Sequence, residues 1–193
     1  MLSLEESLKI LKKTSALVDG HFVLSSGLHS AQYVQCAKLM SKPYIAEKIC
    51  LSLAEKISKE FKDFDIILSP AMGGVVIGYE IGRLLKKETI FSERINNEFI
   101  LRRNFKIKNN TKVLIIEDVI TTGKSSLECS KLVSKNKGII VGYACIIDRS
   151  NGKSKIKDKI VSQIQLDIPT FSKENLPKEL SSIEPVKPGS RNF

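Results

Sequence analysis

The sequence is poor in the residues that build metal sites and disulfide frameworks. Its 193 residues include two histidines and four cysteines, and no CxxC pair occurs. A metal site built from a His/Cys cluster is therefore not expected, and neither is an activated cysteine nucleophile. The cysteines are far apart, mostly in apolar or helical surroundings, at Cys36, Cys50, Cys129 and Cys145. We interpret them as buried thiols of a reducing compartment, and we expect a cytoplasmic protein.

The sequence also lacks a transmembrane run, an internal repeat and a low-complexity linker. Its first 20 residues contain two early glutamates and no continuous apolar core, which argues against a targeting peptide. Ser3 and Glu6 have the spacing of a capping box, and Leu4, Leu8 and Leu11 share one helical face. The sequence therefore predicts an N-terminal amphipathic helix.

The charge balance is strongly positive. The chain has 31 Lys and Arg against 21 Asp and Glu, a formal net charge of +10. Such an excess suggests a negative partner, which could be nucleic acid, an anionic membrane or a phosphorylated metabolite. Solvated surface lysines explain the same number equally well, so charge alone does not decide the function.

Beyond a polar stretch, strand-like runs alternate with helical segments. A periodic helix is predicted to start with Ser41 as its cap and Pro43 in its first turn. The expected strands are 65–69, 89–92, 113–117 and 139–148, with one more near 160–166, and the expected helices are about 74–86 and 123–136. This alternation predicts an α/β fold, with a mostly parallel sheet and helices on both faces. Residues 94–111 are too polar for a crossover helix and are interpreted as a long hairpin or a mobile flap.

The segment VLIIEDVITTGKSS, residues 113–126, carries the strongest chemical signal. A buried strand leads directly into Glu117 and Asp118, then into a Thr/Gly turn and the start of a helix. Free N–H groups at a helix N-terminus and nearby hydroxyls bind phosphate, and the carboxylates accept hydrogen bonds from sugar hydroxyls or lie near hydrated magnesium. Together they predict a ribose 5-phosphate site.

Two common nucleotide-binding motifs do not fit this segment. A P-loop requires a glycine five positions before its second glycine, where this chain has Asp118. No GxGxxG fingerprint of dinucleotide-binding proteins occurs either.

At these residues the chain resembles the type I phosphoribosyltransferases, whose phosphoribosyl diphosphate signature is a hydrophobic strand followed by Glu-Asp and a TTG turn. Three other segments resemble the orotate members of that family. They are GHFVLSSGLHSAQY at 20–33, SPAMGGVVIGYEIGR at 69–83, and DRSNG at 148–152 with PVKPGSR at 185–191.

The resemblance implies one phosphoribosyltransferase domain over 1–193. It implies a core of about 41–153, a hood of about 1–40 with part of the C-terminal tail, and a flexible flap near 94–104. The reaction implied is transfer of the 5-phosphoribosyl group from phosphoribosyl diphosphate to orotate, in pyrimidine biosynthesis. Magnesium as cofactor, a homodimer and no membrane partner are implied as well.

The site residues follow from the motif and the resemblance. Those expected to bind phosphoribosyl diphosphate are Glu117, Asp118, Val119, Ile120, Thr121, Thr122, Gly123, Lys124, Ser125, Gly73 and Gly74. Those expected to bind orotate are Thr121, Arg149, Ser26 and Gly27. Arg149 is favoured because a guanidinium matches the carboxylate of orotate with two parallel hydrogen bonds.

The catalytic group departs from the family pattern. Many members carry a lysine where this chain has Gly73, and their flap is rich in Lys and His. We therefore expect Arg94, Arg102 and Arg103 to act with Asp118 and to stabilise the leaving diphosphate. No protein side chain is assigned as a direct magnesium ligand.

Two alternatives stay open on the sequence alone. A purine phosphoribosyltransferase would share residues 113–126 without needing Arg149. A regulator that senses phosphoribosyl diphosphate and binds RNA fits the positive charge, although we expect no nucleic acid partner. Neither His21 nor His29 is assigned a catalytic role.

Overall fold

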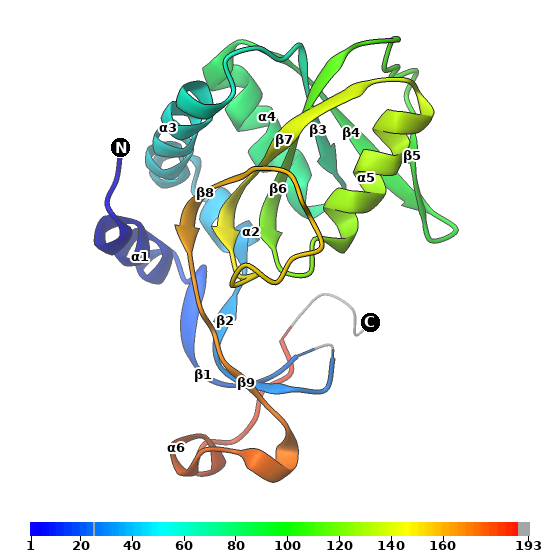
Figure 1. Ribbon diagram of the computed structural model, residues 1–193. Coiled ribbons are helices and arrows are strands. Elements are labelled where there is room, and N and C mark those ends of the chain that lie inside the picture. The colour runs from blue at the N-terminus through cyan, green and yellow to red at the C-terminus, as the bar shows by residue number, and fades with distance from the viewer. Residues whose placement is uncertain (25, 189–193) are drawn as a thin grey trace.

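The computed structural model describes residues 1–24 and 26–188, and two sheets organise them (Figure 1). The larger sheet has the strand order β5-β4-β3-β6-β7-β8. Its strands are β3 (Ile66–Pro70), β4 (Glu88–Ile95), β5 (Glu98–Leu101), β6 (Lys112–Ile120), β7 (Ile139–Asp148) and β8 (Ile160–Gln165). All neighbouring pairs are parallel except β4 and β5, which form an antiparallel hairpin.

Helices cover both faces of this sheet. Leu114 and Ile116 of β6 pack in one apolar cluster with α3 (Pro43–Glu60) and α4 (Gly73–Leu85). Val113 and Ile115 of the same strand pack in a second cluster with α5 (Lys124–Lys135). Alternate residues of a strand point to opposite faces, so the two clusters lie on opposite sides of the sheet. The predicted α/β architecture is confirmed.

A smaller sheet lies beside the carboxyl ends of the large one. It consists of β1 (Leu17–Val23), β2 (His29–Val34) and the short β9 (Thr170–Phe171), in the order β1-β2-β9. The C-terminal segment, with a 3-10 turn (Lys173–Asn175) and α6 (Lys178–Ser181), returns to β1, where Val23 N donates to Val186 O at 2.8 Å. We call β1, β2 and β9 the hood sheet. The resemblance of PVKPGSR extends past residue 188 and lies partly outside the described residues.

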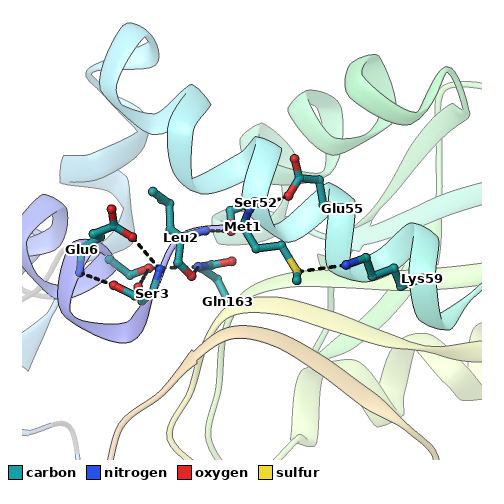
Figure 2. A network of polar contacts seen from close by, with 9 residues as sticks. Met1, Leu2, Ser3, Glu6, Ser52, Glu55, Lys59 and Gln163 are labelled. Carbon is teal, nitrogen blue, oxygen red and sulfur yellow. Dashed lines mark hydrogen bonds and ion pairs between the residues drawn. The ribbon is translucent and has the colours of Figure 1, made fainter.

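Helix α1 (Leu4–Lys13) begins with the predicted capping box and is attached to the core by a polar network (Figure 2). Ser3 Oγ accepts from Glu6 N at 3.1 Å, and Ser3 N donates to the Glu6 carboxylate at 2.7 Å. Leu2 N donates to Ser52 Oγ of α3 at 2.7 Å, and Gln163 of β8 donates to Leu2 O. These bonds join α1 to elements 50 and more residues away.

Three local predictions need correction. Ser41 does not cap α3, because it ends an additional short helix, α2 (Cys36–Met40), and the cap residue of α3 is Lys42, whose side chain makes no capping bond. Leu4 is 55% exposed, so the buried face of α1 is narrower than its periodicity suggests. The strand predicted at 89–92 is longer, since β4 extends to Ile95. The interpretation of 94–111 as a hairpin is confirmed for its first part, which turns at Asn96 and Asn97, both with positive φ, and pairs β4 with β5.

Candidate active site

The parallel register brings four strand ends to one edge of the sheet. Pro70 of β3 pairs with Ser92 of β4, and Ile120 of β6 pairs with Asp148 of β7. In open α/β sheets, ligands bind outside the carboxyl ends of the strands. The segments that follow β3, β6 and β7 are those in which the sequence predicts ligand contacts, so the topology places these segments at one edge.

The Thr/Gly turn, residues 121–123, joins β6 to α5. Thr121 and Thr122 are exposed, while Gly123 is buried with a φ of +75°, a backbone conformation that favours glycine. Helix α5 starts at Lys124 and has no side-chain cap. Lys124 N donates to Thr122 Oγ1 at 3.4 Å, a long hydrogen bond, and the N-cap residue Gly123 offers no side-chain acceptor to the first turn, which includes Ser125. This helix end is suited to an anion.

Glu117 and Asp118 occupy the end of β6 beside this turn, and both are largely buried. Ser126 Oγ donates to Glu117 Oε2 at 2.5 Å, and Val119 N donates to Asp118 Oδ1 at 2.9 Å. Burial raises the pKa of Glu117 to about 7, although the hydrogen bond from Ser126 opposes the rise. Burial raises the pKa of Asp118 as well. Ribose hydroxyls are suitable donors for such carboxylates, because their bonds would favour the ionised form.

The first turn of α4 lies against Asp118. A Cβ atom on Gly73 would come within 2.9 Å of both Asp118 carboxylate oxygens. A Cβ on Gly74 would meet Pro70 Cδ at 3.0 Å and Ile116 O at 3.1 Å. Glycine at both positions lets α4 approach the strand ends closely, and the space beside Asp118 stays open. This contact gives a physical reason for glycine at position 73.

Arg149 directly follows β7 and is fixed through its backbone. Its N–H donates to Ile120 O at 2.8 Å, beside the Thr/Gly turn. Its Nε is buried and has no hydrogen-bond partner among the described residues. Burial lowers the pKa of the Arg149 guanidinium, and the neighbouring Tyr33 acts in the opposite direction. A half-buried guanidinium without a partner is costly, so this position favours an anionic ligand.

The hood sheet contributes residues of two kinds. Ser26 and Gly27 are exposed in the loop between β1 and β2, and no contact among the described residues joins them to Arg149. His21 and His29 are buried instead, with His21 Nε2 and His29 Nδ1 2.6 Å apart and His21 Nδ1 2.8 Å from Ile183 O. The histidine pair thus links the hood strands to the C-terminal segment.

The three flap arginines all pair with carboxylates in this structure. Arg94 binds Glu128 of α5, donates to Asn97 O and stacks on Phe99, with its guanidinium carbon 4.1 Å from the ring centroid. Arg102 and Arg103 both bind Glu93, at 3.2 and 2.9 Å. None of these contacts reaches Asp118. Their role at a leaving diphosphate therefore stays a prediction.

Two residues near the site are absent from the individual site residues predicted from the sequence, although Ser126 belongs to the predicted phosphate-binding segment and Tyr33 to the segment that resembles the hood. Ser126 holds the Glu117 carboxylate, and Tyr33 lies near Arg149. Ser126 could have been found from its place in the first turn of a helix that starts beside the strand end. Tyr33 could not, because its place depends on how the hood sheet packs against the large sheet.

Comparison with known sequences connects this site to one family. The phosphoribosyl transferase domain matches residues 44–175, which include β6, the Thr/Gly turn and Arg149. The chain is 43% identical to an orotate phosphoribosyltransferase of Parvibaculum lavamentivorans over 98% of both chains. It is 45% identical to an orotate phosphoribosyltransferase of Methylorubrum extorquens over 97% of this chain and 96% of the relative.

Solved structures show the same fold at much lower identity. The crystal structure of orotate phosphoribosyltransferase from Aeropyrum pernix has a TM-score of 0.72 and 22% identity, over 82% of this chain and 92% of that chain. An adenine phosphoribosyltransferase from Thermoanaerobacter pseudethanolicus has a TM-score of 0.62 and 16% identity, over 70% of this chain and 88% of that chain. Proteins named for orotate and for adenine share the fold, so the fold alone does not choose the base.

The raised pKa of Glu117 predicts a pH-dependent stability. A carboxylate with a pKa near 4.5 when unfolded and about 7 when folded contributes stability below pH 4.5 that is lost as pH rises through 7. Glu117→Gln removes this group, so the variant should gain up to about 3 kcal/mol over the wild type between pH 5 and pH 8. Urea unfolding of the unliganded proteins at both pH values measures the difference.

The exposed Glu5→Gln variant is the matched control and should follow the wild type at both pH values. If the free energy of unfolding of Glu117→Gln differs from that of the wild type by the same amount at pH 5 and at pH 8, Glu117 ionises as an exposed carboxyl does.

Proposed function

The chain belongs to the orotate phosphoribosyltransferase family, and on this basis we propose that the sheet edge described above carries out the family's reaction. The 5-phosphoribosyl group passes from phosphoribosyl diphosphate to orotate, giving orotidine 5'-phosphate and diphosphate. The ring nitrogen of orotate displaces the diphosphate at the anomeric carbon. This reaction belongs to the synthesis of UMP.

The observation that carries this proposal is the environment of Arg149. Its buried Nε has no hydrogen-bond partner in the described part of the chain, and its backbone N–H donates to Ile120 O at the end of β6. An anionic base fits there, because a guanidinium binds a carboxylate through two parallel hydrogen bonds. Orotate carries a carboxylate, and adenine, hypoxanthine and xanthine carry none. Thr121, beside Ile120, contacts the same base in this assignment, and Ser26 and Gly27 cover it from the hood.

The two substrates have separate anchors. The 5-phosphate binds at the Thr/Gly turn and the first turn of α5, with Lys124 and Ser125. Glu117 and Asp118 accept hydrogen bonds from the ribose hydroxyls, and Gly73 and Gly74 leave space for the diphosphate. Catalysis then comes mainly from positioning the anomeric carbon against the ring nitrogen and from stabilising the leaving group.

Magnesium fits this donor set as an ion that arrives with the substrate. Among residues 1–24 and 26–188, no three His, Cys, Asp or Glu side chains come together as a metal site. Magnesium typically keeps several waters and binds substrate phosphates with few protein ligands. When bound to the diphosphate, the ion neutralises part of the negative charge that develops on departure. We assign no side chain as its direct ligand.

Arg102 and Arg103 are the better candidates for added positive charge at the leaving group. Both are more than half exposed, and they share one carboxylate, that of Glu93, which is 18% exposed. Arg103 also lies over the Phe91 ring, 5.6 Å from its centroid. Because two guanidinium groups share a single negative charge, a diphosphate can compete for them. Arg94 has three contacts and is less exposed, so its main effect in this proposal is to hold the hairpin against α5.

The cellular setting is part of the proposal. All four cysteines are free and buried, which agrees with a reducing cytoplasm. No helix among the described residues combines the length and apolar character needed to cross a membrane. We attribute the net positive charge of the chain to the binding of anionic substrates and not to the binding of nucleic acid.

A homodimer is supported by an exposed apolar stripe on α4. Met72, Val76 and Tyr79 are 82%, 51% and 67% exposed, and their spacing of four and three residues places them on one face. Tyr44 at the start of α3 is 73% exposed. Exposed apolar surface that is contiguous marks an interface in many soluble proteins. We assign this face to a second copy of the chain.

Orotate consumption tests the function. The purified protein, with phosphoribosyl diphosphate and magnesium, should convert orotate, which is followed by the change in its ultraviolet absorbance. Adenine, hypoxanthine and xanthine should not be converted under the same conditions. Conversion of a purine in place of orotate would establish the purine alternative. Tight RNA binding at physiological salt without any turnover would establish the regulator.

Arg149→Ala should raise the KM for orotate far more than the KM for phosphoribosyl diphosphate. Loss of charge-assisted hydrogen bonds costs about 1.5–3 kcal/mol, which corresponds to roughly 10- to 150-fold. Arg149→Lys keeps the charge without the planar fork and should fall between wild type and Arg149→Ala. Steady-state kinetics with each substrate varied in turn gives both values. Equal effects on the two KM values would argue against the assignment.

Tyr79→Glu should convert the dimer to a monomer, because it buries a charge in the proposed apolar interface. Light scattering during gel filtration gives the mass of each species. Ile139→Glu, a change of the same kind at the exposed start of β7, should leave the dimer intact. A wild-type protein that is monomeric at working concentration would refute this interface.

A further inference from the structure

The connection between β7 and β8 is unusual for a parallel pair. Such crossovers commonly contain a helix that covers the sheet. Here residues 149–159 contain no helix or strand, and Figure 1 shows them as a long open loop between the two strands. We call residues 150–158 the strap. The strap begins directly after Arg149, and Ser150 N donates to Asp148 Oδ1 at 2.8 Å.

The strap rests on the Thr/Gly turn. Lys155 N donates to Thr122 O at 3.2 Å. A Cβ atom on Gly123 would lie 2.8 Å from Ile156 Cγ1 and 2.9 Å from Ile156 Cδ1. The side chain of Ile156 therefore fills the space above Gly123.

Ile156 is also part of the apolar core on this face of the sheet. It is 8% exposed and belongs to the cluster that contains Ile120, Cys129 and Tyr143. Ile156 thus belongs to the same buried cluster as a residue of the strand before the turn and a residue of the helix after it. Packing against Gly123 from within this cluster restricts motion of the turn.

The turn is otherwise held by hydrogen bonds, with Lys124 N donating to Thr122 Oγ1 at 3.4 Å and Leu127 N donating to Gly123 O at 2.9 Å. Gly123 is intrinsically flexible, and α5 has no side-chain cap. Yet backbone amides bind a phosphate productively only when their positions are held to within a fraction of an ångström. An external restraint on the turn is consequently useful for binding.

We propose that Ile156 is a positioning residue that holds the Thr/Gly turn in the geometry that binds the 5-phosphate of phosphoribosyl diphosphate. The proposal rests on the proposed function for the identity of the substrate. Ile156 acts through Gly123 and does not touch the substrate.

The chain offers a matched control at the other end of the sheet. Ile107 is 6% exposed, belongs to the same cluster and lies 2.8 Å from the position of a Cβ atom on Gly138. Gly138 directly precedes β7, at the amino ends of the strands. Ile107→Ala therefore removes the same side-chain atoms from the same apolar cluster. The glycine that Ile107 packs against is Gly138, which lies away from the active site.

Three variants form the experiment: Ile156→Ala, Ile156→Val and Ile107→Ala. The two alanine variants should lose similar amounts of thermal stability. Ile156→Ala should raise the KM for phosphoribosyl diphosphate roughly tenfold or more, with a much smaller effect on the KM for orotate. Ile107→Ala should leave both KM values near wild type. Ile156→Val retains most of the contact with Gly123, so its KM values should be close to those of the wild type. This variant remains informative if Ile156→Ala does not fold.

Inorganic phosphate gives a readout that does not require turnover. It should raise the melting temperature of wild type and Ile107→Ala, and raise that of Ile156→Ala much less. A wild-type protein that fails to convert orotate would refute the proposed function, while the phosphate shifts would still test the restraint. Equal KM values and equal phosphate shifts in Ile156→Ala and Ile107→Ala would overturn the proposal.

Discussion

Strand β6 is the constraint on which the rest of the structure depends. It lies at the centre of the large sheet, and its apolar residues Val113 to Ile116 are almost fully buried between helices on both faces. The same strand continues into Glu117 and Asp118, so the carboxylates are held by a rigid and buried backbone. Their raised pKa values follow from this position. A ligand that donates hydrogen bonds compensates for the burial of these groups, which is why a polar site is expected at the end of an apolar strand.

Much of the fold could be predicted because its signals are local. Apolar runs at 66–68, 113–116 and 143–147 identify β3, β6 and β7, and Ser3 with Glu6 identifies the start of α1. Parallel strands then place the segments after them at one edge without any knowledge of side-chain packing. Glu117, Asp118, the Thr/Gly turn and Arg149 were therefore assigned to one edge from the sequence.

The sequence does not predict local structure or side-chain partners where these depend on tertiary contacts. Ser41 has the preferred chemistry of an N-cap, but it is the C-cap residue of the additional helix α2, and α3 begins after Lys42. The hairpin after β4 has its arginines paired with Glu93 and Glu128, partners that no periodicity reveals. The contact of the strap with Gly123 joins residues more than 30 positions apart in the sequence, so no local pattern predicts it.

Charge on this molecule is distributed in a way that suits small anions. Lys153, Lys155 and Lys157 take part in no ion pair among the described residues, and they belong to a strap whose backbone touches the Thr/Gly turn. Lys159, at its end, is bound to Glu60 instead. Positive side chains around a site raise the local concentration of anionic ligands even without direct contact. The strap thus places Lys155 next to the turn that follows β6, at a site that has no lysine at position 73.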